Sequence, residues 1–143
     1  MQERSRARLQ ALQILYQGDI TGTSPMSILA TGSYNAEDGE PSEFCRSLVE
    51  GTEEHAAEID ETIGRTSKHW TVSRMPVVDR NILRLATYEI LHCDSIPVSV
   101  SINEAVEMAK TYGGDDSSRF VNGVLGRIAE TLGQELDEDG ADG

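Results

Sequence analysis

Apolar residues recur at intervals of three or four along most of the chain, which is the spacing of one face of an α-helix. No segment alternates between apolar and polar residues with the period of two that is typical of a half-buried strand. We therefore predict an all-α protein, a single compact domain of about six to seven helices. The segments that carry the helical pattern lie at about residues 5–17, 25–30, 43–63, 77–93, 97–112 and 117–134.

Turn-forming residues mark the ends of several predicted helices. Ser24-Pro25 offers an N-cap followed by proline at the first helical position, and Gly18 and Gly22 are placed to end the first helix. Gly51 interrupts the long third segment. It could bend that helix or let another helix come close.

The segment 77–93 is apolar around nearly its whole circumference, which predicts a buried central helix. Glu89 lies within its main apolar stripe, where an ionised carboxylate needs hydrogen-bond donors or takes up a proton. We expect it to accept hydrogen bonds from the start of a neighbouring helix. A role as a general acid is the alternative, but no second carboxylate or nucleophile lies at a useful spacing.

The C-terminal segment combines glycines with an acidic end. Gly123 and Gly126 lie inside a helical pattern, where each costs about 1 kcal/mol relative to alanine. Close packing of another helix on the bare backbone would explain both glycines. We predict a helical domain over residues 1–134 and, from its composition, a disordered acidic tail over residues 135–143.

Charge is unevenly distributed over the chain. The formal net charge of −13 argues against nucleic-acid binding only if it is evenly spread. The first ten residues contain Arg4, Arg6 and Arg8 but only one acid, whereas the segment from Glu37 to Glu61 carries ten acids and one arginine. A basic end on an acidic body would steer a polyanion toward that end. A solubilising acidic surface with a frayed basic terminus is the alternative.

The remaining composition argues against membrane and metal-binding proteins. No stretch approaches the roughly 20 apolar residues that cross a bilayer, and the N-terminus lacks the apolar block of a signal peptide, so we expect a cytoplasmic protein. Cys45 and Cys93 have no paired spacing, and each is expected to be a small buried apolar group. His55, His69 and His92 do not fall at ligand spacing, so neither a metal site nor a cofactor is predicted.

Several motifs of the chain resemble those of one known family. They are Arg6-Ala7-Arg8 with Ala11-Leu12-Gln13-Ile14-Leu15-Tyr16, the run from Asp79 to Glu89, Ile96-Pro97, Ile102-Asn103-Glu104-Ala105 and Phe120-Val121-Asn122-Gly123-Val124-Leu125. These motifs are similar to those of the bacterial transcription antitermination family NusB, and the similarity covers both ends of the chain in register. The resemblance implies an all-helical protein without enzymatic activity. It also implies binding to the boxA element of rRNA transcripts, as single-stranded RNA, together with the ribosomal protein NusE, in a complex that helps RNA polymerase resist termination.

The resemblance places an RNA-binding surface at the two ends of the domain. Arginines neutralise phosphates, and an exposed aromatic ring can stack on an unpaired base. Asp116 could accept hydrogen bonds from base amino groups or cap the last helix, while Tyr16 and Phe120 could instead belong to the core. The predicted RNA-binding residues are Arg4, Arg6, Arg8, Gln13, Tyr16, Lys110, Tyr112, Asp116, Arg119 and Phe120.

For NusE, the resemblance points to the exposed side of the central helix, with Asp79, Arg80 and Arg84 as charged candidates. Leu9 replaces an acid common in the family, which implies weaker boxA binding here. Some relatives form homodimers that cover the RNA face, and a homodimer is an open alternative for this chain.

Two other classes of function also stay open. One is a domain that binds only protein or resembles the extension of certain rRNA methyltransferases, and the other is a small enzyme using Glu89 or Asp79 in an open pocket.

Overall fold

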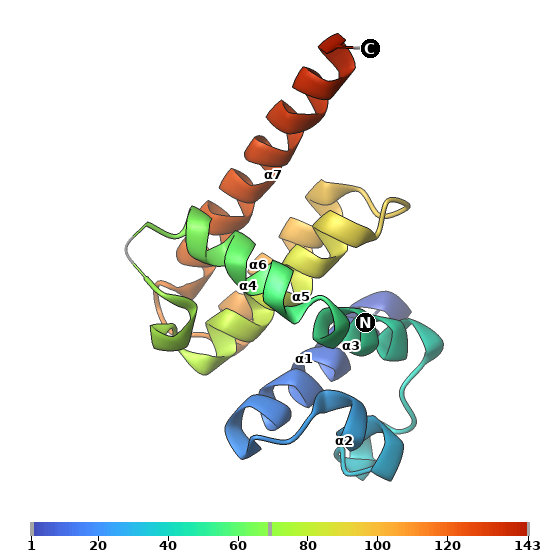
Figure 1. Cartoon of the computed structure of the whole chain (residues 1–143). Helices are drawn as coiled ribbons and strands as arrows, with labels where there is room; N and C mark the ends of the chain where they lie inside the picture. Colours follow the sequence, from blue (N-terminus) through green and yellow to red (C-terminus); the bar gives the residue numbers. More distant parts are fainter. Residues whose placement is uncertain (1, 69, 143) are drawn as a thin grey trace.

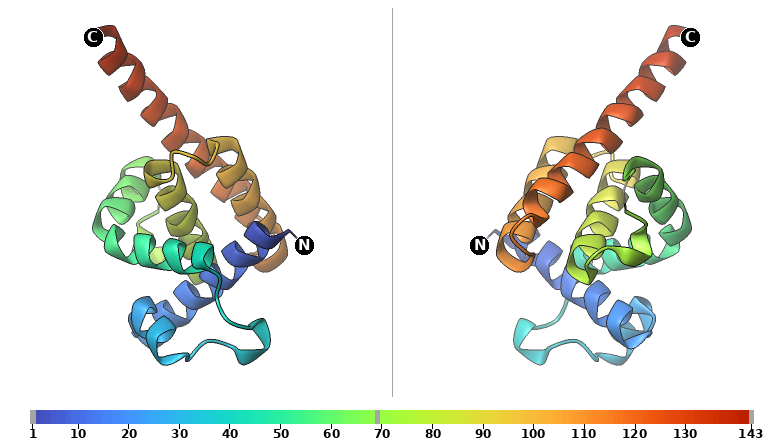
Figure 2. Two further views of the ribbon diagram at one scale, coloured as in Figure 1. Left: turned by 90° about the vertical axis from the view of Figure 1, so that its right-hand side faces the viewer. Right: turned by 90° about the vertical axis from the view of Figure 1, so that its left-hand side faces the viewer.

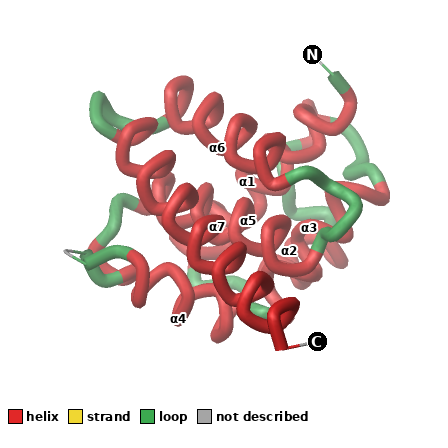
Figure 3. The backbone as a smooth tube through the Cα atoms, turned by 90° about the horizontal axis from the view of Figure 1, so that it is seen from above, coloured by secondary structure: helices red, strands yellow, loops and turns green. Residues whose placement is uncertain are grey.

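The computed structural model describes the backbone of residues 2–68 and 70–142, and the side chains of these ranges as far as residue 133. Within these residues the chain forms seven α-helices and two short 3-10 turns, and no strand (Figure 3). The all-α prediction is therefore confirmed. The elements are α1 (Glu3–Thr21), α2 (Pro25–Thr31), η1 (Ala36–Asp38), α3 (Glu43–Glu54), α4 (Ala56–Thr66), η2 (Val72–Arg74), α5 (Val77–His92), α6 (Val98–Tyr112) and α7 (Ser117–Asp142).

Helix α5 is the centre of the fold, as its apolar circumference predicted. It packs against α1, α3, α4, α6 and α7, which surround it (Figure 1). Its side chains Ile82, Leu83 and Leu85 are completely buried. Helix α7 extends beyond this body, and the segment between α2 and α3 projects at the other end of the molecule (Figure 2).

The predicted helix over residues 43–63 is two helices in the structure. Helix α3 ends at Glu54 and α4 begins at Ala56, because His55 leaves helical geometry with φ −101° and ψ 20°. Gly51 does not cause the break. A Cβ atom on Gly51 would lie 2.0–2.3 Å from three atoms of the Tyr88 side chain, so this glycine lets α5 approach α3. The second of the two roles predicted for Gly51 is therefore the correct one.

The start of the chain follows the predicted pattern with one difference. The hydroxyl of Ser24 accepts a hydrogen bond from the Ser27 N–H and caps α2, as predicted. Helix α1 is longer than predicted because Gly18 lies inside it. The helix instead ends at Gly22, which takes a left-handed φ of 70° and donates its N–H to the carbonyl of Gly18.

The glycines of α7 do not have the role we predicted. A Cβ atom on Gly123 would approach only the guanidinium of Arg127, at 3.5 Å, and one on Gly126 would meet nothing within 4 Å. In the part of the chain that the structure describes, no neighbouring helix comes within 4 Å of a Cβ atom at either position, so the close-packing prediction is wrong. The helix also continues, as far as Asp142, through the segment predicted to be disordered.

A buried ion pair joins three helices beneath the predicted RNA surface. Arg8 of α1 donates from Nε and Nη2 to the carboxylate of Glu89 on α5, at 2.8–3.1 Å. Ser101, in the first turn of α6, donates its hydroxyl to the same carboxylate at 3.0 Å. Glu104 adds a second acid 3.8 Å from Arg8 and accepts a hydrogen bond from Ser5. The arrangement fixes the N-terminal half of α1 against α5 and α6.

This ion pair corrects two predictions. Arg8 is only 2% exposed, so it belongs to the interior rather than to an RNA-binding surface. Burial lowers the pKa of Arg8, but the hydrogen bonds and the charge of Glu89 outweigh that effect and raise it overall. Glu89 does accept a hydrogen bond from the start of a neighbouring helix, through Ser101, but Arg8 is its main partner. Glu89 is only 2% exposed, and its carboxylate is occupied by Arg8 and Ser101, which argues against the general-acid alternative.

A second polar network joins α1, α4 and α5. Asp19 accepts two hydrogen bonds of 2.7 Å from Arg80, one of 2.9 Å from Asn81 and one of 3.1 Å from Arg84. Arg84 also donates to both carboxylate oxygens of Asp60, at 2.9 and 3.1 Å. Hydrogen bonding from Arg80 holds the pKa of Asp19 below its ordinary value. The two arginines predicted to bind NusE are thus already paired with acids of the same chain.

Replacing Glu89 by glutamine should destabilise the fold by about 3–5 kcal/mol, because Arg8 would keep its charge in the interior without a carboxylate. The double variant Arg8→Met with Glu89→Leu should recover most of that loss, since it removes both charges. Urea denaturation followed by circular dichroism measures both. A single variant within about 1 kcal/mol of the parent would show that the pair does not hold these helices together.

The Asp19 network should make stability depend on pH. The pKa of Asp19 is lower in the folded chain than its ordinary value of 3.8, so its stabilisation is present at neutral pH and is lost as the pH falls through the lowered pKa. Asp19→Asn should therefore cost about 1–2 kcal/mol at pH 7. The difference from the parent should shrink below about pH 4. A difference that stays constant between pH 7 and pH 3 in urea titrations would contradict this assignment.

Candidate nucleic-acid interface

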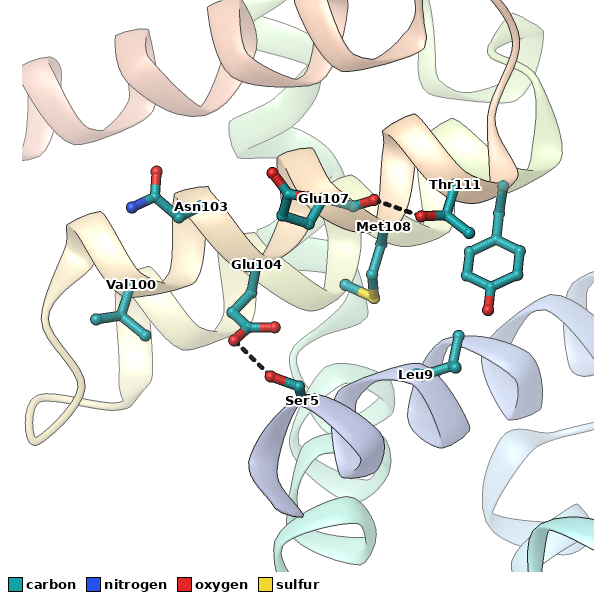
Figure 4. A pocket seen from close by; sticks show the side chains of 9 residues that line it. Ser5, Leu9, Val100, Asn103, Glu104, Glu107, Met108 and Thr111 are labelled. Carbon is teal, nitrogen blue, oxygen red and sulfur yellow. Dashed lines mark hydrogen bonds between the residues drawn. The ribbon is translucent and has the colours of Figure 1, made fainter. Parts of the chain in front are cut away.

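A groove of about 440 Å³ runs between the start of α1 and the outer face of α6. Ser5 and Leu9 line it from α1, and Glu104, Met108 and Tyr112 belong to its α6 wall. Figure 4 shows the hydroxyl of Ser5 donating to Glu104 across the groove, a hydrogen bond of 2.7 Å. The groove brings Tyr112 of the predicted RNA surface beside the helix that carries the N-terminal arginines.

The outer face of α1 carries the other predicted residues of that helix. At 100° per residue, Arg6, Leu9, Gln13 and Tyr16 lie on one side of α1, and the structure leaves Arg6 and Gln13 exposed. Tyr16 is 38% exposed, which excludes the alternative that it is a core residue. Gln13 and Tyr16 line a second hollow, shared with the Tyr34 side chain of the loop after α2.

The turn between α6 and α7 is held by a buried hydrogen-bond chain. Ser117 donates its hydroxyl to Asp79 of α5 at 2.7 Å and accepts a hydrogen bond from the Gly114 N–H at 2.8 Å. The turn is so tight that a Cβ atom on Gly113 would lie 2.5 Å from the side chain of Ser117 and 2.8 Å from the carbonyl of Ala109. Asp79 is 4% exposed, so its predicted contact with NusE is wrong. It positions this turn instead.

The anchored turn presents four of the predicted residues. Tyr112 is 48% exposed before the turn, Asp116 and Arg119 are exposed within and after it, and Phe120 is half-buried against the core. The Asp116 carbonyl accepts a hydrogen bond from the Phe120 N–H, which gives Asp116 the N-cap position of α7. One turn earlier on α6, Lys110 forms an exposed ion pair with Glu107. Such a pair contributes little to stability, so the ammonium group of Lys110 is free to exchange partners.

The three N-terminal arginines have three different environments. Arg8 is buried, and Arg6 is exposed on the outer face of α1. The guanidinium of Arg4 lies over the ring of Phe44 on α3, 4.6 Å from its centroid, a cation–π arrangement. Around the helix axis Arg4 is about 160° from Arg6. The structure therefore does not bring the predicted basic cluster together as one patch.

The charge of the groove was not predicted. Glu104 and Glu107 line it, and both would repel a phosphate. The positive predicted residues are exposed outside its lining, Arg6 on α1, Lys110 on α6 and Arg119 on α7. Sequence patterns could not find the groove, because its walls are made by residues about one hundred positions apart.

The arrangement offers binding chemistry. Exposed phenol rings, amides and cations can stack on bases, read base edges and neutralise phosphates. The acids of the groove sit among apolar side chains and hydroxyls. Among the residues that the structure describes, no helix has both the length and the apolar character needed to cross a membrane.

Comparisons with known proteins agree with the resemblance found in the sequence. A family profile described as "NusB family" matches residues 5–130. The chain is 51% identical over 131 residues to the "Transcription antitermination protein NusB" of Pelotomaculum thermopropionicum, and the match covers 90% of each protein. The solved structure of T. maritima NusB matches with a TM-score of 0.78 at 39% identity, over 90% of this chain and 92% of that one.

A second solved structure includes bound partners. It is described as "Antitermination Factors NusB and NusE in complex with dsRNA" and matches with a TM-score of 0.72 at 30% identity. The match covers 90% of this chain and 96% of that one.

Gly113→Ala should loosen the turn between α6 and α7, because its methyl group would displace Ser117 from Asp79. We expect a loss of about 1–3 kcal/mol and faster hydrogen exchange at the Gly114 amide. Gly126→Ala is the matched control, since a Cβ atom there meets nothing and should stabilise α7 slightly. Equal effects of the two variants on stability and exchange would show that the turn is not anchored as described.

Proposed function

Since the chain belongs to the NusB family of transcription antitermination proteins, we propose that it binds the boxA element of nascent rRNA transcripts together with the ribosomal protein NusE. The family's members are antitermination factors rather than enzymes. The RNA-binding unit would be the domain over residues 1–134. The complex would act in the cytoplasm on transcribing RNA polymerase, as part of an antitermination complex.

One observation carries the RNA proposal. Tyr112 is exposed at one wall of the groove whose other wall is the arginine-bearing helix α1. An exposed ring beside separated cations suits an unpaired base with its flanking phosphates, because bases in a duplex have their faces covered. The RNA in the related NusB–NusE structure is double-stranded. Our proposal of single-stranded boxA RNA therefore rests on the stacking surface and on the family resemblance.

The proposed RNA-binding residues of this chain are the exposed members of the predicted set. Arg8 is left out because it is buried, and Phe120 contributes mainly by supporting the start of α7. Gln13 and Asp116 would contact base edges, whereas the cations would contact phosphates. The set comprises Arg6, Gln13, Tyr16, Lys110, Tyr112, Asp116 and Arg119, with Arg4 as a separate contact on the Phe44 side of α1.

The surface proposed for NusE includes Arg80 and Arg84. Both side chains are about one fifth exposed while paired with Asp19 and Asp60, so a partner would meet a mixed, nearly neutral surface there.

A homodimer would compete with RNA for the surface formed by α1. The apolar side chains of Leu9 and Tyr16 share one face of α1 with Ile20, which is 56% exposed, and a second copy that covered them would exclude RNA.

Tyr112→Ala should weaken boxA binding by about 1–3 kcal/mol, the usual contribution of a base stacked on an aromatic ring. Tyr112→Phe should restore it, since phenylalanine stacks equally well. Fluorescence anisotropy with labelled boxA RNA, in the presence of NusE, measures both. If the parent protein bound boxA and a scrambled RNA equally well, the hypothesis of boxA recognition would be excluded. A domain that binds only protein would then be the remaining hypothesis.

Arg6→Ala and Arg119→Ala should each weaken RNA binding and lower the salt dependence of log K by about one. Arg46→Ala on α3 is the matched control, because it removes an exposed arginine outside the proposed surface. Anisotropy titrations at several salt concentrations give the slopes. An Arg46 variant that changes the slope as much as the other two would place the RNA elsewhere on the molecule.

A further inference from the structure

Two histidines and a glutamate from distant parts of the chain meet on the surface, away from the groove. His55 lies between α3 and α4, Glu58 is one turn further on α4, and His92 is the last residue of α5. One potential ligand atom from each lies within 4.8 Å of the other two. The two imidazole rings stack, with centroids 3.9 Å apart, and the Nε2 atom of His92 hydrogen-bonds to a carboxylate oxygen of Glu58.

We propose that this cluster binds one divalent transition-metal ion, with Zn²⁺ as the best match. Two imidazoles and one carboxylate form a donor set that zinc uses when a fourth position stays open to water. In a tetrahedral site with bonds of about 2.0–2.2 Å, ligand atoms lie roughly 3.3–3.6 Å apart. The three side chains are half-buried or exposed, so small rotations can close the present separations.

The backbone already favours chelation. His55 and Glu58 are three residues apart at the start of α4, where side chains at that spacing share a face. His92 reaches them because α5 packs along both α3 and α4. The spacing of the histidines along the sequence did not predict this site. That spacing takes no account of a carboxylate ligand or of a contact between two helices.

The surroundings favour a cation. The segment that leads into His55 is acidic, with Glu50 and Glu54 in the last part of α3. Cys93 follows His92 and is the obvious competing ligand. Its thiol is not among the potential ligand atoms that lie within 4.8 Å of one another, so Cys93 is not one of the proposed ligands.

A bound ion would clamp the start of α4 to the end of α5. Calorimetric titration of the full chain with ZnCl₂ should give one site per chain and a dissociation constant below about 100 µM. The affinity should fall as the pH is lowered, because protons compete for the imidazole nitrogens. Saturating Zn²⁺ should also raise the Tm of the parent protein, because the ion binds only the folded chain.

His92→Gln and Glu58→Gln should each weaken Zn²⁺ binding by about tenfold or more, since each removes one of three protein ligands. Glu61→Gln removes an exposed acid from the same helix and should leave the affinity unchanged. Cys93→Ser should also leave it unchanged. Thermal melts without metal establish that each variant is folded before it is titrated.

Three results would overturn the proposal. One is a parent protein whose dissociation constant for Zn²⁺ is above about 100 µM. A second is equal affinity of the parent, the His92 variant and the Glu58 variant. The third is loss of binding in the Cys93 variant, which would assign the ion to a thiolate site. None of these measurements depends on RNA or NusE, so their outcome is independent of the proposed function.

Discussion

The position of α1 depends on a charged pair that is removed from water. Arg8 and Glu89 are separated by 81 residues, and neither charge is tolerated in the interior without the other. Such a pair adds little net stability compared with apolar residues of the same size, but it admits one arrangement of the helices that carry it. Because Ser101 shares the carboxylate, that arrangement includes α6. The shape of the groove between α1 and α6 therefore depends on the Arg8–Glu89 ion pair beneath it.

Helix α5 holds its neighbours through separate polar anchors along its length. Asp79 near its start holds the turn before α7, Arg80 and Arg84 hold the end of α1 and the middle of α4, and Glu89 holds the start of α1 and α6. The apolar side chains between these anchors supply the bulk of the buried surface. The anchors determine register, because each requires a partner at one position only. This is why α5 can be deeply buried although it carries the charged residues Asp79, Arg80, Arg84 and Glu89.

The sequence predicted the features that depend on local chemistry. The Ser24 cap, the boundaries of α5 and the end of α6 at Gly113 follow from propensities within a few residues. The predictions for Arg8 and Asp79 were wrong for a common reason: charged residues are ordinarily exposed, and nothing local indicates a partner 81 or 38 residues away. The exposure of Tyr16, the lack of packing on Gly123 and the meeting of His55 with His92 likewise depend on where other helices lie.

The contact between Gly51 and Tyr88 has a consequence one turn along both helices. His55 follows Gly51 by four residues, and His92 follows Tyr88 by four. The pairs Gly51–Tyr88 and His55–His92 therefore lie about one helical turn apart along the same contact. Because Gly51 has no side chain, the Tyr88 ring can lie against it and beside the two stacked imidazoles. Lineages that acquire alanine at position 51 would therefore be expected to carry a smaller residue at position 88, or to lose the imidazole stacking. Positions 51, 55, 88 and 92 should vary as a group.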